Sequence, residues 1–88
     1  MKRTRQTYNV LQILAETPTE EWYGLELMDA TKLKSGSLYP ILARLEAHRI
    51  VRRRVEKGNP VTLGRPARIY YKITKAGQDL FMKWSAQQ

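Results

Sequence analysis

The periodicity of the sequence changes once, after Arg49, and this change constrains the fold more than any other feature. Before it, apolar residues recur at i, i+3, i+4 and i+7, the spacing of one apolar stripe on a helix. The stripe consists of Leu38, Ile41, Leu42 and Leu45. After it, apolar and charged residues alternate with a period of two over 51–56 and 68–73, as in two half-buried strands of a hairpin. Because an isolated hairpin is unstable in water, it must pack one face on the helices. The sequence therefore predicts an α+β fold that is mainly helical.

The other helices are predicted from apolar spacing and from stop and cap signals. Pro18 ends the first helix, and Thr74 is a suitable N-cap for the last. The four predicted helices span residues 7–16, 23–30, 37–48 and about 75–88. With the hairpin they give the order of a winged helix-turn-helix: three helices, a two-stranded wing and a C-terminal helix. We expect one such domain over residues 1–88.

The start of the third helix depends on its proline. With Ser37 as N-cap, Pro40 falls in the first turn, where its missing N–H breaks no internal hydrogen bond. With Ser35 as N-cap, one hydrogen bond would be lost. We therefore expect the helix to begin at Ser37.

The strands of the hairpin are predicted to turn alternate residues toward the helices. In the first strand Val51, Arg53 and Val55 alternate with Arg52, Arg54 and Glu56, and in the second the inward set is Ile69, Tyr71 and Ile73. The connection between the strands is too long for a tight turn, and it is rich in turn-forming residues. These are Gly58, Asn59, Pro60, Gly64 and Pro66. We expect this loop to project as a flexible tip.

Missing residue types exclude several kinds of chemistry. The chain has no cysteine and a single histidine, His48, which excludes disulfides, thiolate catalysis and zinc sites built from cysteine or histidine. No nucleophile with a base and no glycine-rich phosphate loop is present, so we expect neither an enzyme nor a cofactor. The apolar stretch 10–15 is too short for a signal peptide or a membrane span. A cytoplasmic protein is expected.

Positive charge is in excess and is segregated along the chain. The formal net charge is +8 with a pI near 10.1. Residues 16–29 contain five acids and no base, whereas 44–75 contain ten bases and two acids. A polyanionic partner is the natural interpretation, and the basic half is the side expected to face it.

In a winged helix-turn-helix, the third helix lies in the major groove of double-stranded DNA and the wing contacts phosphates or the minor groove. We expect Ser37, Tyr39 and Arg44 to contact bases, and basic residues of the preceding turn and of the wing to contact phosphates. The candidate DNA-binding residues are Lys32, Lys34, Ser35, Ser37, Tyr39, Pro40, Arg44, Arg52, Arg54, Lys57, Asn59, Arg65 and Arg68. The structural alternatives are that Tyr39 packs on the hairpin, that Arg44 pairs with Glu46 or a neighbouring acid, and that the basic run is only a solvated face.

The aromatic residues have two interpretations. Tyr70 and its neighbours could form a stacking surface for single strands, but a core role is favoured. Phe81 and Trp84, three apart on the last helix, suit either a core stripe or a dimer seam. A pocket wall at that seam is a weaker interpretation of Trp84.

Three stretches resemble the PadR family of bacterial transcriptional regulators. They are 23–27 (YGLEL), 35–46 (SGSLYPILARLE) and 64–77 (GRPARIYYKITKAG). The resemblance implies a winged-helix repressor that binds an inverted-repeat operator, generally as a homodimer. It also implies that Ser37, Tyr39 and Pro40 lie at the DNA end of the third helix. Family members usually continue into a longer helical segment that builds the dimer and, in some, a ligand pocket. A small-molecule effector is compatible with this resemblance but is not indicated by the sequence.

Two other classes of function remain open on sequence alone. One is a binder of RNA or single strands that uses the hairpin and Tyr70. The other is a protein-interaction module in which the acidic segment 16–29 docks a basic partner.

Overall fold

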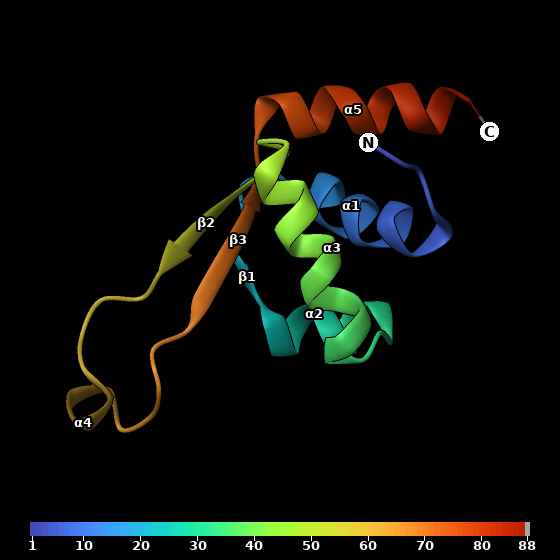
Figure 1. Ribbon diagram of the computed structural model, residues 1–88. Helices are drawn as coiled ribbons and strands as arrows, with labels where there is room; N and C mark the ends of the chain where they lie inside the picture. Colours follow the sequence, from blue (N-terminus) through green and yellow to red (C-terminus); the bar gives the residue numbers. More distant parts are fainter. Residues whose placement is uncertain (88) are drawn as a thin grey trace.

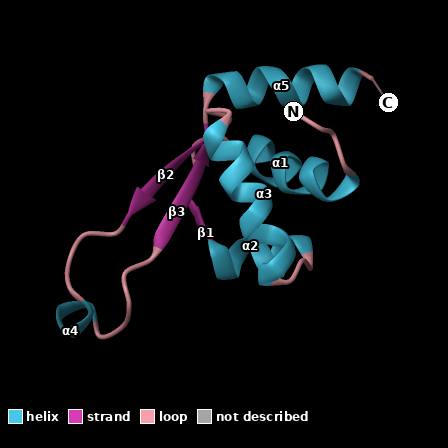
Figure 2. Cartoon of the chain, in the orientation of Figure 1, coloured by secondary structure: helices cyan, strands magenta, loops and turns pink. Residues whose placement is uncertain are grey.

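The computed structural model describes residues 1–87 and has the winged-helix arrangement, α+β and mainly helical (Figures 1 and 2). In chain order the elements are α1 (Arg5–Glu16), β1 (Trp22–Tyr23), α2 (Gly24–Thr31), α3 (Ser35–Ala47), β2 (Val51–Val55), α4 (Pro60–Leu63), β3 (Ile69–Ile73) and α5 (Lys75–Ala86). The helices α1, α2, α3 and α5 form the body, and the β2–β3 hairpin projects from it as the wing (Figure 1).

The core lies where α1, α3 and the base of the wing meet. The predicted stripe of α3 is confirmed, because its four apolar residues are at most 2% exposed. The other buried apolar residues are Val10, Leu11, Leu14, Leu27, Ile50, Val51, Tyr71, Ile73 and Trp84. The burial of Trp84 supports the core interpretation of that residue. Phe81 is partly buried on the same helix, and its ring lies 5.4 Å from that of Tyr8.

The wing belongs to a three-stranded antiparallel sheet with the order β1-β3-β2. The prediction of two strands therefore missed a third one, β1. This strand pairs with the other edge of β3, where Trp22 lies opposite Tyr71 and Tyr23 lies opposite Tyr70. The sequence did not predict β1, because a strand of two residues is too short to show an alternating pattern. Trp22 is held by a hydrogen bond of 2.9 Å from its Nε1 to Thr17 Oγ1.

The predicted start of α3 at Ser37 is wrong. The helix begins at Ser35, and the carbonyl of Lys34 accepts hydrogen bonds from the N–H groups of Ser37 and Leu38, both at 3.0 Å. Pro40 therefore lies inside the helix. It removes only its own N–H, and the carbonyl left without that donor belongs to the exposed Gly36, which water can reach.

The predicted loop at the wing tip contains a helical turn, α4. Asn59 caps it, accepting a hydrogen bond of 2.8 Å from the N–H of Thr62. Gly64 ends it with φ 70°, in the left-handed region. The tip contains more regular secondary structure than predicted, because a side-chain cap and a glycine terminate one turn from both sides.

The other boundaries are close to those predicted. The first helix starts two residues earlier, at Arg5, with Thr4 as N-cap. Thr74 caps α5 as predicted and accepts a hydrogen bond from the N–H of Gly77. The final residue of the predicted last helix, Gln88, lies outside the described residues.

Candidate nucleic-acid interface

The third helix and the wing diverge from a common junction and both extend away from α5 (Figure 1). Arg49 forms the junction in the left-handed conformation, with φ 59°. Thr74 clamps it: its hydroxyl donates to the Arg49 carbonyl at 2.7 Å, and its N–H donates to the Ile50 carbonyl at 3.0 Å. The clamp sets the angle between α3 and the wing.

The surface of α3 opposite the apolar stripe carries the predicted base-contacting residues. Ser35, Tyr39, Pro40 and Arg44 are exposed, and Ser37 is half-buried. In the described part of the chain, Arg44 forms no ion pair with Glu46. The Arg44 guanidinium is therefore available to a ligand.

Tyr39 has a defined place at the start of this surface. Its side chain is 43% exposed, and its phenol end lies against the backbone of Gly24, where a β-carbon would collide with it. The glycine at the start of α2 thus leaves room for the tyrosine of α3. The stretches 23–27 and 35–46, which resemble the same family, therefore meet at this contact.

The turn between α2 and α3 exposes two lysines. Lys32 adopts a left-handed conformation, with φ 62°, and Lys34 is extended. The Lys32 ammonium lies 3.5 Å from Asp29, and both side chains are more than 80% exposed. Such an exposed pair contributes little, so the lysine can exchange this partner for a phosphate.

The outer face of the wing is a stack of aromatic and cationic side chains. The guanidinium of Arg54 lies 4.8 Å from the ring centre of Tyr70, and that of Arg68 lies 4.2 Å from Tyr23. The two tyrosine rings meet edge to face at 5.9 Å. Because these rings already face guanidinium groups and each other, the wing presents no open stacking platform in this state.

Two wing arginines are paired with carboxylates. Arg54 binds Glu21 through two hydrogen bonds of 2.7 and 3.0 Å, and Arg65 binds Glu56 through two of 2.6 and 3.0 Å. The hydrogen bonds from Arg65 and from the N–H of Arg68 lower the pKa of Glu56 to about 2. Likewise, the hydrogen bond from Arg54 lowers the pKa of Glu21. Part of the charge assigned to phosphates is therefore balanced within the protein.

Arg52 and Lys57 remain exposed and outside these pairs, and the structure adds cations that the sequence analysis did not select. Arg53, which alternates with Arg52 and Arg54 in the sequence, is exposed, because β2 leaves the core after Val51. Lys72 lies opposite Arg52 in the register of the sheet. Arg52, Arg53 and Lys72 line an open hollow of about 420 Å³, together with Thr19, Glu21 and Arg54. Lys72 alternates outward in the sequence, a signal that could have identified it.

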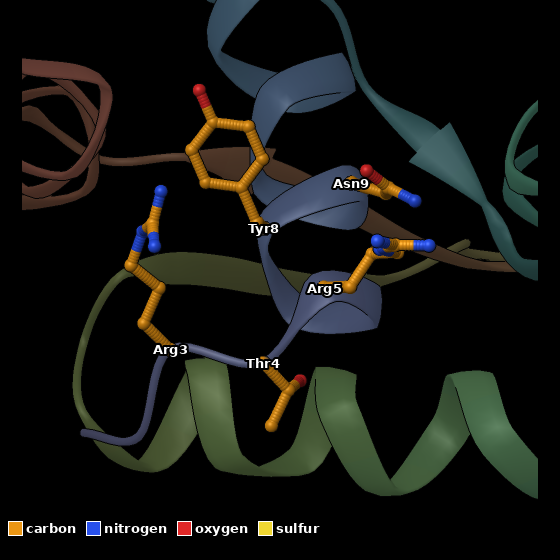
Figure 3. A pocket seen from close by; sticks show the side chains of 5 residues that line it. All are labelled: Arg3, Thr4, Arg5, Tyr8 and Asn9. Carbon is orange, nitrogen blue, oxygen red and sulfur yellow. The ribbon is translucent and has the colours of Figure 1, made fainter. Parts of the chain in front are cut away.

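A second hollow, of about 390 Å³, lies at the start of α1 (Figure 3). Arg3 turns toward Tyr8 there, with its guanidinium 5.0 Å from the ring centre, whereas Arg5 and Asn9 point to the other side (Figure 3). This hollow lies away from the wing (Figure 1). The hollow at the start of α1 is thus separate from the wing.

Residues 1–87 contain no group of three or more His, Cys, Asp or Glu side chains placed to hold a metal ion. None of the helices described is long and apolar enough to cross a bilayer.

Solved structures share this fold. A PadR-like transcription factor from Bacteroides fragilis superposes with a TM-score of 0.77 at 23% identity, covering 92% of this chain and 77% of that one. The transcriptional regulator PA4135 gives 0.72 at 30% identity, and NadR in complex with 4-hydroxyphenylacetate gives 0.71 at 25%. Each covers 96% of this chain, which spans only 56% of PA4135 and 54% of NadR.

No curated protein sequence matches this chain significantly. The family model of the PadR-like transcriptional regulators, however, matches residues 10–83, which include all of the elements from α2 to β3. The chain belongs to the PadR-like family of transcriptional regulators.

Proposed function

We propose that this protein is a sequence-specific double-stranded DNA-binding repressor without catalytic activity, acting in the cytoplasm. The observation that carries the proposal is the common direction of α3 and the basic wing, both of which extend away from α5 (Figure 1). A helix in the major groove with a ribbon on the adjacent backbone requires this arrangement. Membership of a family of transcriptional regulators supports it.

In this proposal α3 provides specificity and its surroundings provide position. Ser37, Tyr39 and Arg44 contact base edges in the major groove, with Ser35 and Pro40 at the entering end. Phosphate contacts come from the turn and the wing. The residues proposed for them are Lys32, Lys34, Arg52, Arg54, Lys57 and Arg68, to which the geometry adds Arg53 and Lys72.

The carboxylate pairs add a condition to the roles of Arg54 and Arg65. Each arginine must either share its guanidinium between carboxylate and phosphate or exchange partners on binding. The Arg54–Glu21 pair is 51% and 37% exposed, so exchange costs little there. The Glu56 side chain is only 19% exposed, so release of Arg65 costs more. Arg52 and Lys57 need no such exchange, and we assign them the first phosphate contacts.

A homodimer is part of the proposal, because an inverted-repeat operator needs two copies related by a two-fold axis. Sedimentation of the free protein and of its DNA complex measures this stoichiometry. One copy per operator at saturation would contradict the dimer.

Effector binding is not proposed. NadR was solved with 4-hydroxyphenylacetate, but this chain spans about half of that protein. Trp84, the residue considered as a pocket wall, is packed into the core.

The test is selection of duplexes from a random pool, followed by competition with single-stranded DNA and structured RNA at one salt concentration. Two mirrored half-sites and preference for the duplex are expected. Equal binding of all three nucleic acids, or no enrichment, would overturn the proposal. A pull-down of protein partners that resists nuclease, without duplex selection, would favour an interaction module instead.

A further inference from the structure

The guanidinium group of Arg54 is bound along one edge only. Its Nε and Nη2 donate to the two carboxylate oxygens of Glu21, at 2.7 and 3.0 Å. A guanidinium has five N–H donors, and this pair uses two of them. Within residues 1–87 no other acceptor binds Arg54, and its side chain is 51% exposed. Its terminal edge, formed by Nη1 and Nη2, is therefore free to bind a second anion.

The plane of this guanidinium is fixed as well. Arg54 lies over the ring of Tyr70, 4.8 Å from its centre, and Tyr70 is the residue opposite it in the register of β2 and β3. The Tyr70 ring in turn meets that of Tyr23 edge to face, at 5.9 Å. A carboxylate on one edge and a ring on one face leave the group few orientations. The terminal edge is thus presented in a defined direction.

Arg65 is bound in the opposite manner. Its Nη1 and Nη2 both donate to Glu56, at 2.6 and 3.0 Å, and Nη1 also donates to the carbonyl of Pro66 at 3.2 Å. The protein itself therefore occupies the terminal edge of this arginine. Its partner is also the more buried carboxylate, 19% exposed against 37% for Glu21. Of the two paired arginines of the wing, only Arg54 has this edge free for a ligand.

The surroundings of Arg54 carry unbalanced positive charge. It lines the open hollow of about 420 Å³ together with Arg52, Arg53 and Lys72, and Glu21 is the one carboxylate among the described residues that line it. Arg52 and Lys72 lie directly opposite each other in the sheet, where like charges destabilise a strand pair. Neither forms an ion pair within residues 1–87. A further anion in this hollow would relieve the excess charge.

We propose that Glu21 and Tyr70 are positioning residues, which hold Arg54 so that its terminal edge binds a DNA phosphate while Glu21 stays bound. The inference rests on the proposed function and deepens it, because it decides between sharing and exchange for this arginine. The ligand is a phosphodiester of the duplex backbone, whose two free oxygens match the two nitrogens of the edge. Arg65, whose terminal edge is occupied, makes no such contact.

Two effects of the Glu21 carboxylate oppose each other. It repels phosphates, but at an exposed position water and salt screen this repulsion. It also fixes a long side chain in advance, so that less conformational entropy is lost when the phosphate binds. The proposal requires the second effect to be the larger. Removal of the carboxylate should therefore weaken binding, although it makes the protein more positive.

The first experiment compares Glu21→Gln with Glu20→Gln on a duplex selected by the wild-type protein. Both variants remove one negative charge just before β1, but Glu20 is exposed and forms no ion pair within the described residues. We expect Glu21→Gln to weaken binding about 3- to 10-fold and Glu20→Gln to change it less than about 2-fold. Unchanged or tighter binding by Glu21→Gln would mean that the carboxylate competes with the phosphate, and would overturn the proposal.

A double-mutant cycle shows whether Glu21 acts through Arg54. In an Arg54→Ala background, Glu21→Gln should no longer weaken binding, because the side chain that it positions is gone. Equal losses in the two backgrounds would show that Glu21 acts on another part of the protein. Its assignment as a positioning residue would then be wrong.

The second experiment separates geometry from charge. Arg54→Lys keeps the charge, but an ammonium group has no second edge with which to hold Glu21 and a phosphate in one fixed geometry. Arg52 is the matched control, since it lies two residues away on the same face of β2 and outside the ion pairs described. We expect Arg54→Lys to weaken binding about 3- to 10-fold and Arg52→Lys less than about 2-fold. Equal losses at the two positions would contradict the special geometry of Arg54.

The third experiment follows the Nε–H proton of Arg54 by NMR, because this proton donates to Glu21. Sharing requires the hydrogen bond to persist, so we expect the signal to keep its shift when DNA is added. In Glu21→Gln the signal should move in the free protein. A wild-type signal that moves to the same place on DNA binding would show exchange of partners and overturn the inference. Failure of the wild-type protein to select any duplex would instead overturn the proposed function.

Discussion

Two glycines show how strongly the effect of one methyl group depends on what surrounds it. A β-carbon on Gly77 would meet the carbonyl of Ile50 and the side chain of Ile73, both fixed in the core junction. A β-carbon on Gly24 would meet only the phenol end of Tyr39, which is partly exposed and can turn. Alanine should therefore cost much more folding stability at Gly77 than at Gly24.

We expect Gly77→Ala to lower the free energy of unfolding by roughly 1 to 3 kcal/mol, because backbone cannot move aside as a side chain can. Gly24→Ala should stay within about 1 kcal/mol of wild type, since the helix gains from alanine what the displaced ring loses. Urea denaturation measures both. A larger loss for Gly24→Ala than for Gly77→Ala would contradict the assignment.

Residues of α3 and of the wing should differ in what they contribute to binding. Replacing Tyr39 or Arg44 by Ala should reduce discrimination by roughly 1 to 3 kcal/mol for each lost base contact. Lys57→Ala should weaken all duplexes alike, because phosphates carry no sequence information. Binding titrations on the selected duplex and on a scrambled one provide the comparison. Uniform loss in all three variants would show that this division is wrong.

The wing tip is joined to the strands through the carboxylate of Glu56, whose pKa is unusually low. The pKa of Glu56 falls from 4.5 to about 2, chiefly through the hydrogen bond from Arg65. Since the folded pKa lies below the unfolded one, the stabilisation is fully present above pH 4.5 and is lost as pH falls toward 2.

The amide proton of Arg68, which donates to Glu56, reports this change. Its NMR shift should titrate with a midpoint near 2, and Arg65→Met should raise that midpoint toward the ordinary glutamate value. An unchanged midpoint in Arg65→Met would mean that Arg65 does not hold the carboxylate.

The whole molecule is polarised, with α5 at one end and the free ends of α3 and the wing extending away from it (Figure 1). With about six phosphates neutralised, the logarithm of affinity should fall with the logarithm of salt concentration at a slope near −5. Lys57→Ala should reduce the magnitude of the slope by about 1. A nearly flat response would contradict the electrostatic part of the proposal. The control is Lys83→Ala on α5, which should leave the slope unchanged.

Local patterns in the sequence were sufficient for much of the fold. The stripe of α3, the alternation of β2 and β3 and the cap at Thr74 each depend on residues a few positions apart, so their chemistry is visible along the chain. The same holds for the motifs that indicated the PadR family. Local signals failed where an element is very short, as in β1 and α4. They also failed at the start of α3, where Ser35 and Ser37 were both candidate N-caps and Pro40 favoured the wrong one.

The pairing of the cations of the wing, in contrast, was decided by tertiary structure. Arg54 meets Glu21, which is 33 residues away, and Arg68 meets the ring of Tyr23 only because β1 joins the sheet. The amino-acid sequence determined that this ribbon would be cationic. Only the fold decided which of its cations are paired and which face solvent, because an ion pair depends on distance in space rather than separation along the chain.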